Sequence, residues 1–396
     1  MSSWRGGLFG FRLFYRLPRC HGAWLGTGGD AFLAALLIPA MALREPLFID
    51  GPVSRTLLDN LRRAMDLLVA WNAANPWIRL HRVPLAAATV VAPEPASGSA
   101  LFFSGGVDSF YALRQPGSAA VRHLVFVHGF DLPLERPDLR RSISHRLRQA
   151  AAATGRDLVE VETNYRTLSD PIVSWTMAHG GALAAVGHAL AGGARRFGIS
   201  ATDIYGTGAT WGTHPQLDRL WSSGVVEFAS VGAEARRGSK LAALRDFVPA
   251  QEHLRVCWNH TSQAYNCCRC RKCLRTMLHL YIHGALGRFP TFPHPPPLDL
   301  LERMIEPPHL WFLWDDLAAG LEGRGETEVA AQVRRMLQRS RRHGGERSPQ
   351  GRRAAAAPIA VLVARGATRS PSLVWLRRLH WRLRRQWWAL RAARAP

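Results

Sequence analysis

Two short stretches of this sequence hold residue types that could carry out chemistry. The first is Ser104–Ser109, which reads Ser-Gly-Gly-Val-Asp-Ser and lies between the apolar runs Leu101–Phe103 and Phe110–Leu113. A buried strand that leads into a glycine loop at the start of a helix exposes free backbone N–H groups, and glycine lets an anion approach the backbone closely. The stretch therefore predicts a site for the phosphates of a nucleotide.

Each residue of this loop has an expected role. Hydroxyl and backbone donors would bind the phosphates, whereas Asp108 would repel them, so we expect Asp108 to bind a bridging Mg²⁺. Asp108 and Ser109 are the candidate catalytic residues. The loop is not a Walker loop, because no Gly-Lys-Ser/Thr follows it, and an ordinary serine–glycine turn is the alternative. The residues expected to bind the nucleotide here are Ser104, Gly105, Gly106, Val107, Asp108 and Ser109.

The second stretch is a cluster of cysteines. Five of the six cysteines fall between Cys257 and Cys273, which favours a metal site in a reducing compartment over a spread-out disulfide framework. Four thiolates close together suit a tetrahedral zinc ion, and an iron–sulfur cluster is the competing hypothesis. Cys268 is then an extra thiol. The expected ligands, spaced as C-x9-C-x2-C-x2-C, are Cys257, Cys267, Cys270 and Cys273.

The glycine loop resembles the SGGxDS signature of the PP-loop ATP pyrophosphatases, the adenine nucleotide alpha hydrolase-like superfamily. Its members split ATP between the α- and β-phosphates, leave AMP on a substrate oxygen, and let a nucleophile, often nitrogen or sulfur, displace it. With the cysteine site downstream, residues 98–292 look most similar to the 7-cyano-7-deazaguanine synthase branch, which makes a nitrile from a carboxylate and ammonia. The resemblance implies ATP, Mg²⁺ and Zn²⁺ as cofactors and a small-molecule acceptor.

Residues after the later strands are candidates for the remainder of the ligand. We expect the backbone at Val127 and His128, and around Ser200, to bind adenosine. Asp203, His214 and Asp218 are candidates for contacts with the acceptor. For the last two, a capped turn with a surface histidine is the alternative.

The alternation of apolar strands and helices after Ala100 predicts an α/β fold with a doubly wound parallel sheet, helices on both faces, and ligands beyond the carboxyl ends of the strands. The cysteines would form a zinc-binding insertion in that domain. Strands are expected at 101–103, 122–128, 158–163 and 197–201, and helices at 139–154, 171–191 and 274–282.

The segments before and after this domain do not continue its alternation of strands and helices. In the N-terminal segment, we expect a strand at 47–49 that ends in the turn 50–52, then a helix at 55–71 capped by Ser54. After Pro293, helices are expected near 298–305, 310–321 and 326–342. The expected divisions are an α+β unit at 1–95, an ATP-binding domain at 98–292 with its metal module at 257–273, a helical extension at 293–342, and a basic tail at 343–396 whose spacer, 343–372, precedes a helix.

The net charge of +22 is concentrated at one end of the chain. Residues 334–396 contain 17 arginines and a single acid, which leaves only +6 for the other 333 residues. A tail helix with tryptophans at 375 and 387 among arginines suggests an anionic membrane surface or a nucleic acid as its partner; an arginine-rich helix without a partner is the alternative. Only Lys240 and Lys272 are lysines, a bias typical of GC-rich genomes.

The sequence predicts a cytoplasmic protein, because the apolar run 31–43 is too short to span a bilayer and contains Pro39, and the arginines near the N-terminus are not followed by a continuous apolar core. We expect an ATP-dependent enzyme that adenylates a substrate oxygen, releases pyrophosphate and uses a nitrogen nucleophile, and that could act as a homodimer. The alternatives are a tRNA sulfur-transfer enzyme with an iron–sulfur cluster and a non-catalytic ATP-binding protein.

Overall fold

The computed structural model describes residues 3–4, 11–74, 79–91, 97–202, 210–258, 264–343 and 360–362. Its centre is a six-stranded sheet in the order β2-β7-β6-β5-β8-β9. Five strands run parallel, and β2 pairs antiparallel with β7 at one edge. The expected α/β class with a mostly parallel central sheet is confirmed. The strands are β2 (Tyr15–Arg16), β5 (Ser99–Phe102), β6 (His123–His128), β7 (Asp157–Thr163), β8 (Arg196–Ser200) and β9 (Glu227–Val231).

The strand order determines where a ligand would bind. The chain runs outward from β5 to β6 and β7, then returns to the other side of β5 to form β8 and β9. Connections therefore leave the carboxyl ends of β5 and β8 in opposite directions and open a crevice between them. Ser200 Oγ donates a hydrogen bond to the Phe102 carbonyl across this point, at 3.5 Å.

Both faces of the sheet are buried, which explains why its strands read as continuous apolar runs rather than alternating ones. Leu101 and Phe103 pack in a core with α3, α4, α8, α9 and α10, whereas Phe102 packs on the opposite face with α6. The helix expected at 171–191 is shorter and follows a separate α5. The helices are α3 (Val107–Leu113), α4 (Pro137–Ala153), α5 (Tyr165–Ser169), α6 (Trp175–Ala189), α7 (Pro215–Asp218), α8 (Arg237–Leu244), α9 (Val248–His253) and α10 (Arg271–Ile282).

The N-terminal segment shares its hydrophobic core with the α6 face of the sheet. Helix α1 (Asp30–Leu43) is buried on nearly all sides, which accounts for its apolar composition. Helix α2 (Arg55–Ala70) begins at the expected cap, where Ser54 Oγ accepts from the Leu57 N–H. The same part of the structure contains a second sheet, whose strands lie in the order β1-β10-β3-β4. Its strands are β1 (Ser3–Trp4), β3 (Leu47–Ser54), β4 (Leu85–Val91) and β10 (Ala360–Leu362).

Two expectations about this sheet are wrong. Asp50-Gly51-Pro52 does not end the strand: β3 continues to Ser54, and its pairing with β4 shifts register between Ile49 and Pro52. An irregularity of this kind accommodates glycine and proline within a strand. The spacer expected at 343–372 also contains β10, which pairs parallel with β3. The basic helix expected after it lies outside the described residues.

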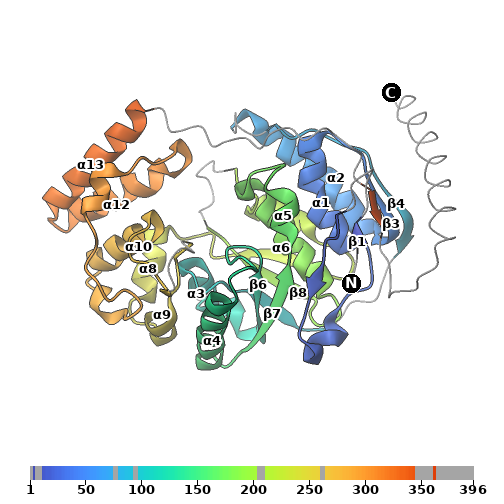
Figure 1. Ribbon diagram of the computed structural model, residues 1–396, viewed down its shortest axis with the longest axis horizontal. Coiled ribbons are helices and arrows are strands. Elements are labelled where there is room, and N and C mark those ends of the chain that lie inside the picture. The colour runs from blue at the N-terminus through green and yellow to red at the C-terminus, as the bar shows by residue number, and fades with distance from the viewer. Residues whose placement is uncertain are drawn as a thin grey trace.

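Three C-terminal helices pack on α10 through a separate core that contains Leu274, Leu278 and the buried Trp314. Figure 1 shows the central sheet between α1 and α2 at one end of the molecule and α12 and α13 at the other. The metal module and α10 therefore lie between the sheet and the C-terminal helices. These helices are α11 (Asp299–Arg303), α12 (Trp311–Gly323) and α13 (Thr327–Arg342).

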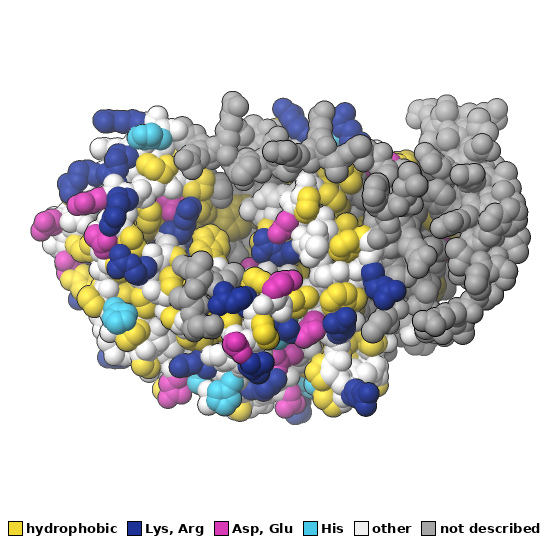
Figure 2. Space-filling view, viewed as in Figure 1, with side chains coloured by type: hydrophobic (Ala, Val, Ile, Leu, Met, Phe, Trp, Pro, Cys, Tyr) yellow, Lys and Arg dark blue, Asp and Glu magenta, His cyan; other side chains and the backbone are white. Residues whose placement is uncertain are grey.

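Basic and acidic side chains are interspersed over the described surface visible in Figure 2. This agrees with the small net charge of the chain before residue 334. Among the helices of the described residues, none combines the length and apolarity needed to cross a bilayer.

Candidate functional site

The glycine loop follows β5 directly and is fixed in one conformation. Gly105 has a φ of +73°, in the left-handed region that favours glycine, and a Cβ there would lie 2.7 Å from Leu147 Cδ2, so the leucine side chain would have to shift to accommodate it. The Gly105 carbonyl accepts a hydrogen bond of 2.7 Å from the Arg255 N–H. Ser104 is exposed, while Ser109 is buried and donates its hydroxyl proton to the Gly106 carbonyl at 3.0 Å.

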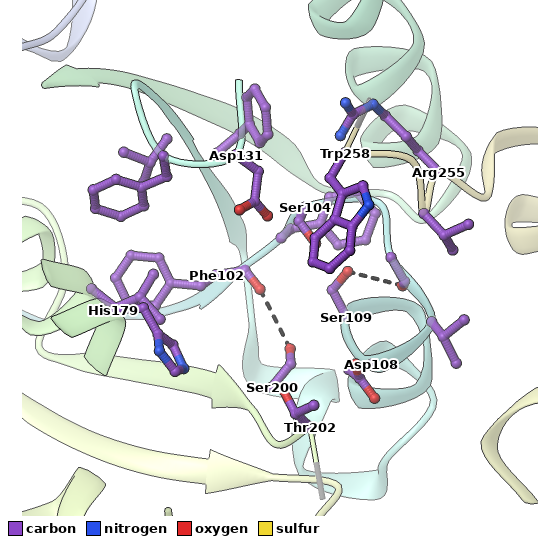
Figure 3. A pocket seen from close by; sticks show the side chains of 18 of the residues that line it. Phe102, Ser104, Asp108, Ser109, Asp131, His179, Ser200, Thr202, Arg255 and Trp258 are labelled. Carbon is purple, nitrogen blue, oxygen red and sulfur yellow. Dashed lines mark hydrogen bonds between the residues drawn. The ribbon is translucent and has the colours of Figure 1, made fainter. Parts of the chain in front are cut away.

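A cleft opens over this loop at the carboxyl ends of β5, β6 and β8 (Figure 3). Of the residues expected to bind a nucleotide, Gly105 lies behind the lining, because its carbonyl faces the Arg255 backbone. The topology thus brings together segments of the chain about 100 residues apart. The expected residues that line the cleft are Ser104, Gly106, Val107, Asp108, Ser109, Val127 and Ser200.

His128 is an exception, because its side chain does not line the cleft and belongs to a charge network between the sheet and α4. Arg140 Nε donates to Nδ1 of His128 at 3.3 Å, so Nε2 carries the proton and donates to Glu160 at 2.8 Å. Burial alone would raise the pKa of Glu160, but hydrogen bonds from His128 and Ser144 lower it to about 2. Any contact of His128 with a nucleotide is therefore limited to its backbone.

Asp108 already has two cationic partners. Lys240 Nζ lies 3.0 Å from Asp108 Oδ1, and Arg237 Nη1 lies 3.5 Å from Oδ2. Both cations come from α8, and the Lys240 side chain is fully buried. The carboxylate expected to bind a bridging Mg²⁺ is thus paired with two cations in the structure, and binding of Mg²⁺ by Asp108 stays a prediction. Asp108 acts first as the carboxylate that neutralises two buried cations.

Positive charge around the loop still exceeds negative charge. Arg255 and Lys272 line the same cleft as Arg237, and the buried Arg275 lies behind them. The Nε atoms of Arg237, Arg255 and Arg275 are buried without a hydrogen-bond partner in the described part of the chain. Burial, with the nearby Arg237 charge, lowers the pKa of Arg275 to about 9. Buried cations need a compensating charge, so the cleft suits a ligand with several negative charges.

The sequence contained a signal for this cluster that its motifs did not reveal. The chain has only two lysines, and both are here: Lys240 contacts Asp108, and Lys272 lines the cleft. Arginine differs from lysine in shape and hydrogen-bond geometry. In a chain that uses arginine almost everywhere else, positions that keep lysine are therefore candidates for a function that needs a compact ammonium group.

The far end of the cleft is aromatic. Phe130 and Trp175 lie with ring centroids 5.0 Å apart, and His179 follows Trp175 by one helical turn on α6. His179 Nδ1 lies 3.1 Å from the Trp175 carbonyl and Nε2 lies 3.1 Å from Thr213 Oγ1, so two contacts fix the orientation of the ring, and burial lowers its pKa. Figure 3 shows His179 across the cleft from Trp258. Residues at positions i and i+4 lie on the same face of a helix, so the spacing of Trp175 and His179 could have indicated from the sequence that both side chains point to the same side of α6.

Two of the three residues expected to contact the acceptor, His214 and Asp218, lie away from the cleft. Asp218 is buried and accepts hydrogen bonds from the His214 N–H, at 3.1 Å, and from Ser230 Oγ. Burial raises its pKa to about 7. His214 caps α7 and packs against Trp71, with ring centroids 5.2 Å apart. Neither side chain lines the cleft, and Asp203 lies outside the described residues.

The four spaced cysteines converge as expected. One sulfur from each of Cys257, Cys267, Cys270 and Cys273 lies within 4.8 Å of the others. A tetrahedral ion with Zn–S bonds of about 2.3 Å places its sulfurs about 3.8 Å apart, which this cluster fits. A multi-iron cluster spreads its cysteines over different metal atoms, so a single ion fits this spacing better. Cys268, at a φ of +54°, directs its thiol to the Asn266 carbonyl instead.

Asn266 is the residue that holds the cysteine segments together. Its Oδ1 accepts from the Val256 and Cys257 N–H groups at 2.9 and 3.2 Å, and its Nδ2 donates to the Leu254 and Thr291 carbonyls. Within the second segment, Cys270 caps α10 by accepting from the Cys273 N–H. No motif identifies Asn266, because its four partners are brought to it by the fold.

The electrostatics of the cysteines also favour a bound cation. Hydrogen bonding to Cys257 raises the pKa of Cys270 to about 11, and hydrogen bonds with Cys257 and Cys270 raise that of Cys273 as well. Thiolates packed this closely repel one another, so a metal ion is needed to hold them deprotonated. The cluster therefore has the chemistry of a metal site such as one for Zn²⁺.

Comparisons of this chain with protein-family models, with curated proteins and with solved structures found no match.

Proposed function

We propose that this protein is an ATP-dependent enzyme that transfers AMP to a substrate oxygen, releases pyrophosphate, and then lets a nitrogen nucleophile displace the AMP. The observation that carries the proposal is the excess of cations facing a glycine loop at the switch point of the sheet, with the buried Arg237 and Arg255 and the half-buried Lys272 lining the cleft. The resemblance of the loop to SGGxDS supports the same reaction class.

In this proposal the loop and the cations bind the pyrophosphate end of ATP. Ser104 and the backbone at Gly106 would donate hydrogen bonds to phosphate oxygens, and Arg237 and Lys272 would neutralise charge as pyrophosphate leaves. Lys240 would keep Asp108 and Arg237 in place from beneath the loop. Catalysis would then consist mainly of positioning and charge stabilisation.

Metal ions have separate roles in the proposal. The four cysteines fit a structural zinc ion, which would hold the module folded without entering the reaction. Two carboxylates, Asp108 and Asp131, line the cleft, and Asp108 is already paired with Lys240 and Arg237, so Mg²⁺ would come mainly bound to the phosphates of ATP, as is usual for this ion. Its charge would assist the departure of pyrophosphate.

The aromatic end of the cleft is the proposed site for planar groups. Adenine and a small acceptor both need flat apolar walls and a few oriented hydrogen-bonding groups. Phe130, Trp175 and His179 provide these, and Val127 of β6 lines the same cleft. The acceptor would therefore be a small ring-bearing molecule rather than a long chain.

Calorimetric titration tests the phosphate site. The metal-loaded full chain should bind both ATP and pyrophosphate, and Arg237→Met should weaken each by about tenfold or more, because a charge-assisted hydrogen bond is lost. Arg236→Met is the matched control, since Arg236 is exposed and pairs with Asp316 at 3.3 Å. Thermal unfolding of both variants checks that the fold is intact. Absence of binding to ATP and pyrophosphate, or equal losses in the two variants, would refute the proposed site.

A further inference from the structure

The cysteine cluster and the anion cleft share residues that adjoin each other in the chain. Trp258 directly follows the ligand Cys257, and Lys272 directly precedes the ligand Cys273. Both Trp258 and Lys272 line the cleft, and Lys272 Nζ lies 5.5 Å from the centre of the Trp258 ring. Figure 3 shows Trp258 on the side of the cleft that holds Ser104, Ser109 and Arg255.

We propose that a metal ion in the four-cysteine site would hold Trp258 and Lys272 in position on this wall of the cleft. Binding of the metal ion and binding of a phosphate-bearing ligand would therefore strengthen each other. The inference rests on the proposed function, because it requires phosphate to bind at the loop. It adds a specific role for Lys272 as the residue through which the two sites are coupled.

The coupling follows from the way the two cysteine segments meet. Cys257 belongs to the first segment, and the other three ligands belong to the second, so one metal ion ties the segments together. On the cleft side, the contact between Trp258 and Lys272 spans the same junction. A ligand that binds Lys272 in this position favours the arrangement of segments that the metal also requires. Two ligands that favour the same arrangement must raise each other's affinity by the same factor.

Electrostatic repulsion between the metal site and phosphate opposes this coupling. Zinc with four thiolates carries a net charge of about −2, which would repel phosphate. Arg271 and Arg275 lie on the same helix as Lys272 and balance that charge locally. The Glu306 carboxylate is fully buried and lies 3.6 Å from Arg271, so its negative charge cancels part of the positive charge of these arginines. We therefore expect the positional effect to prevail, and the sign of the coupling is itself the test.

The experiment measures zinc affinity of the full chain by equilibrium competition with a chelator, with and without saturating pyrophosphate. A blank without protein corrects for zinc bound by pyrophosphate. The wild-type chain should bind zinc about fivefold or more tightly when pyrophosphate is present, the lower range of typical coupling between sites. In Lys272→Met this gain should disappear while zinc still binds.

Arg269→Met provides the matched control, because Arg269 is a basic residue of the same module that is exposed and lies 3.3 Å from Asp299. It should retain the gain. Separate calorimetry with pyrophosphate distinguishes the two ways of failing. Absence of pyrophosphate binding would overturn the proposed function together with the coupling. Normal binding with an unchanged or lowered zinc affinity, or equal loss of the gain in both variants, would overturn the coupling alone.

Discussion

Lys240 and Asp108 are 132 positions apart in the chain, yet Lys240 Nζ lies 3.0 Å from Asp108 Oδ1. The lysine is fully buried and also donates to the Ala201 carbonyl. This pair joins α8 to the glycine loop and to the end of β8. It fixes the loop that the proposed function assigns to phosphate, and it gives Asp108 a role beyond that of a metal ligand.

Breaking this pair should destabilise the fold. Asp108→Asn leaves the Lys240 ammonium buried without its counter-charge, which should lower the free energy of unfolding by about 3 kcal/mol. Adding Lys240→Met should recover part of that loss, because the uncompensated charge is gone. Urea unfolding of the single and double variants measures the effect, with Asp59→Asn in the exposed pair with Arg62 as a control that should change little. Additive losses in the double variant would contradict the pairing.

Asn266 should be needed for both the fold and the metal. Asn266→Ala leaves four buried backbone groups near Cys257 without partners, which should cost on the order of 3 kcal/mol or more. Because those bonds bring Cys257 to the other ligands, zinc affinity should fall as well. Unfolding curves and chelator competition measure the two effects. Wild-type zinc affinity in this variant would show that the cysteines assemble without Asn266.

The ligand assignment predicts different outcomes for adjacent cysteines. Cys270→Ser should lose the metal and destabilise the chain, because Cys270 is a ligand and also caps α10. Cys268→Ser should keep about one metal ion per chain, since its thiol points to the Asn266 carbonyl. Metal analysis of the purified variants is the measurement. The assignment would be wrong if Cys268 proved essential for metal and Cys257 dispensable.

Asp218 should make stability depend on pH. Burial raises its pKa from 3.8 to about 7, so the folded chain holds a proton that the unfolded chain releases at lower pH. Its contribution is fully present below about pH 4 and is lost as the pH rises to about 7, with a slope of about 1.4 kcal/mol per pH unit. Asp218→Asn should remove this component of the slope while keeping the hydrogen bond from the His214 N–H. Urea unfolding between pH 4 and 8 compares the two proteins, and identical slopes would contradict the shifted pKa.

The sequence revealed the parts of the site whose information is local. The loop at 104–109 and the cysteines at 257–273 are contiguous or closely spaced, and their chemistry depends on spacing alone. The central strands of the sheet were also predictable from local sequence, because strands that are buried on both faces read as continuous apolar runs. The Ser54 cap could be predicted because it needs only its own helix.

The remainder depends on contacts that the fold creates. Arg237 reaches Asp108 only because β9 and α8 follow the crossover to β8, and β9 was not predicted. Asn266 has no motif, and its partners span residues 254–291. Asp218 follows a strand of the expected sheet in the sequence, and only its burial and its bond from the His214 N–H show that its role is structural rather than a contact with the acceptor. The sequence showed that the chain has only two lysines, but only the structure showed that one lines the cleft and the other contacts a residue that does.

In the proposed function, the glycine loop serves a reaction in which ATP is cut between its α- and β-phosphates. The most direct measurement incubates the metal-loaded full chain with Mg²⁺ and ATP labelled in the α-phosphate, using a protein-free cell extract as the source of the acceptor. This reaction should leave the label in AMP or in an AMP ester and release unlabelled pyrophosphate. Label recovered in ADP would contradict it.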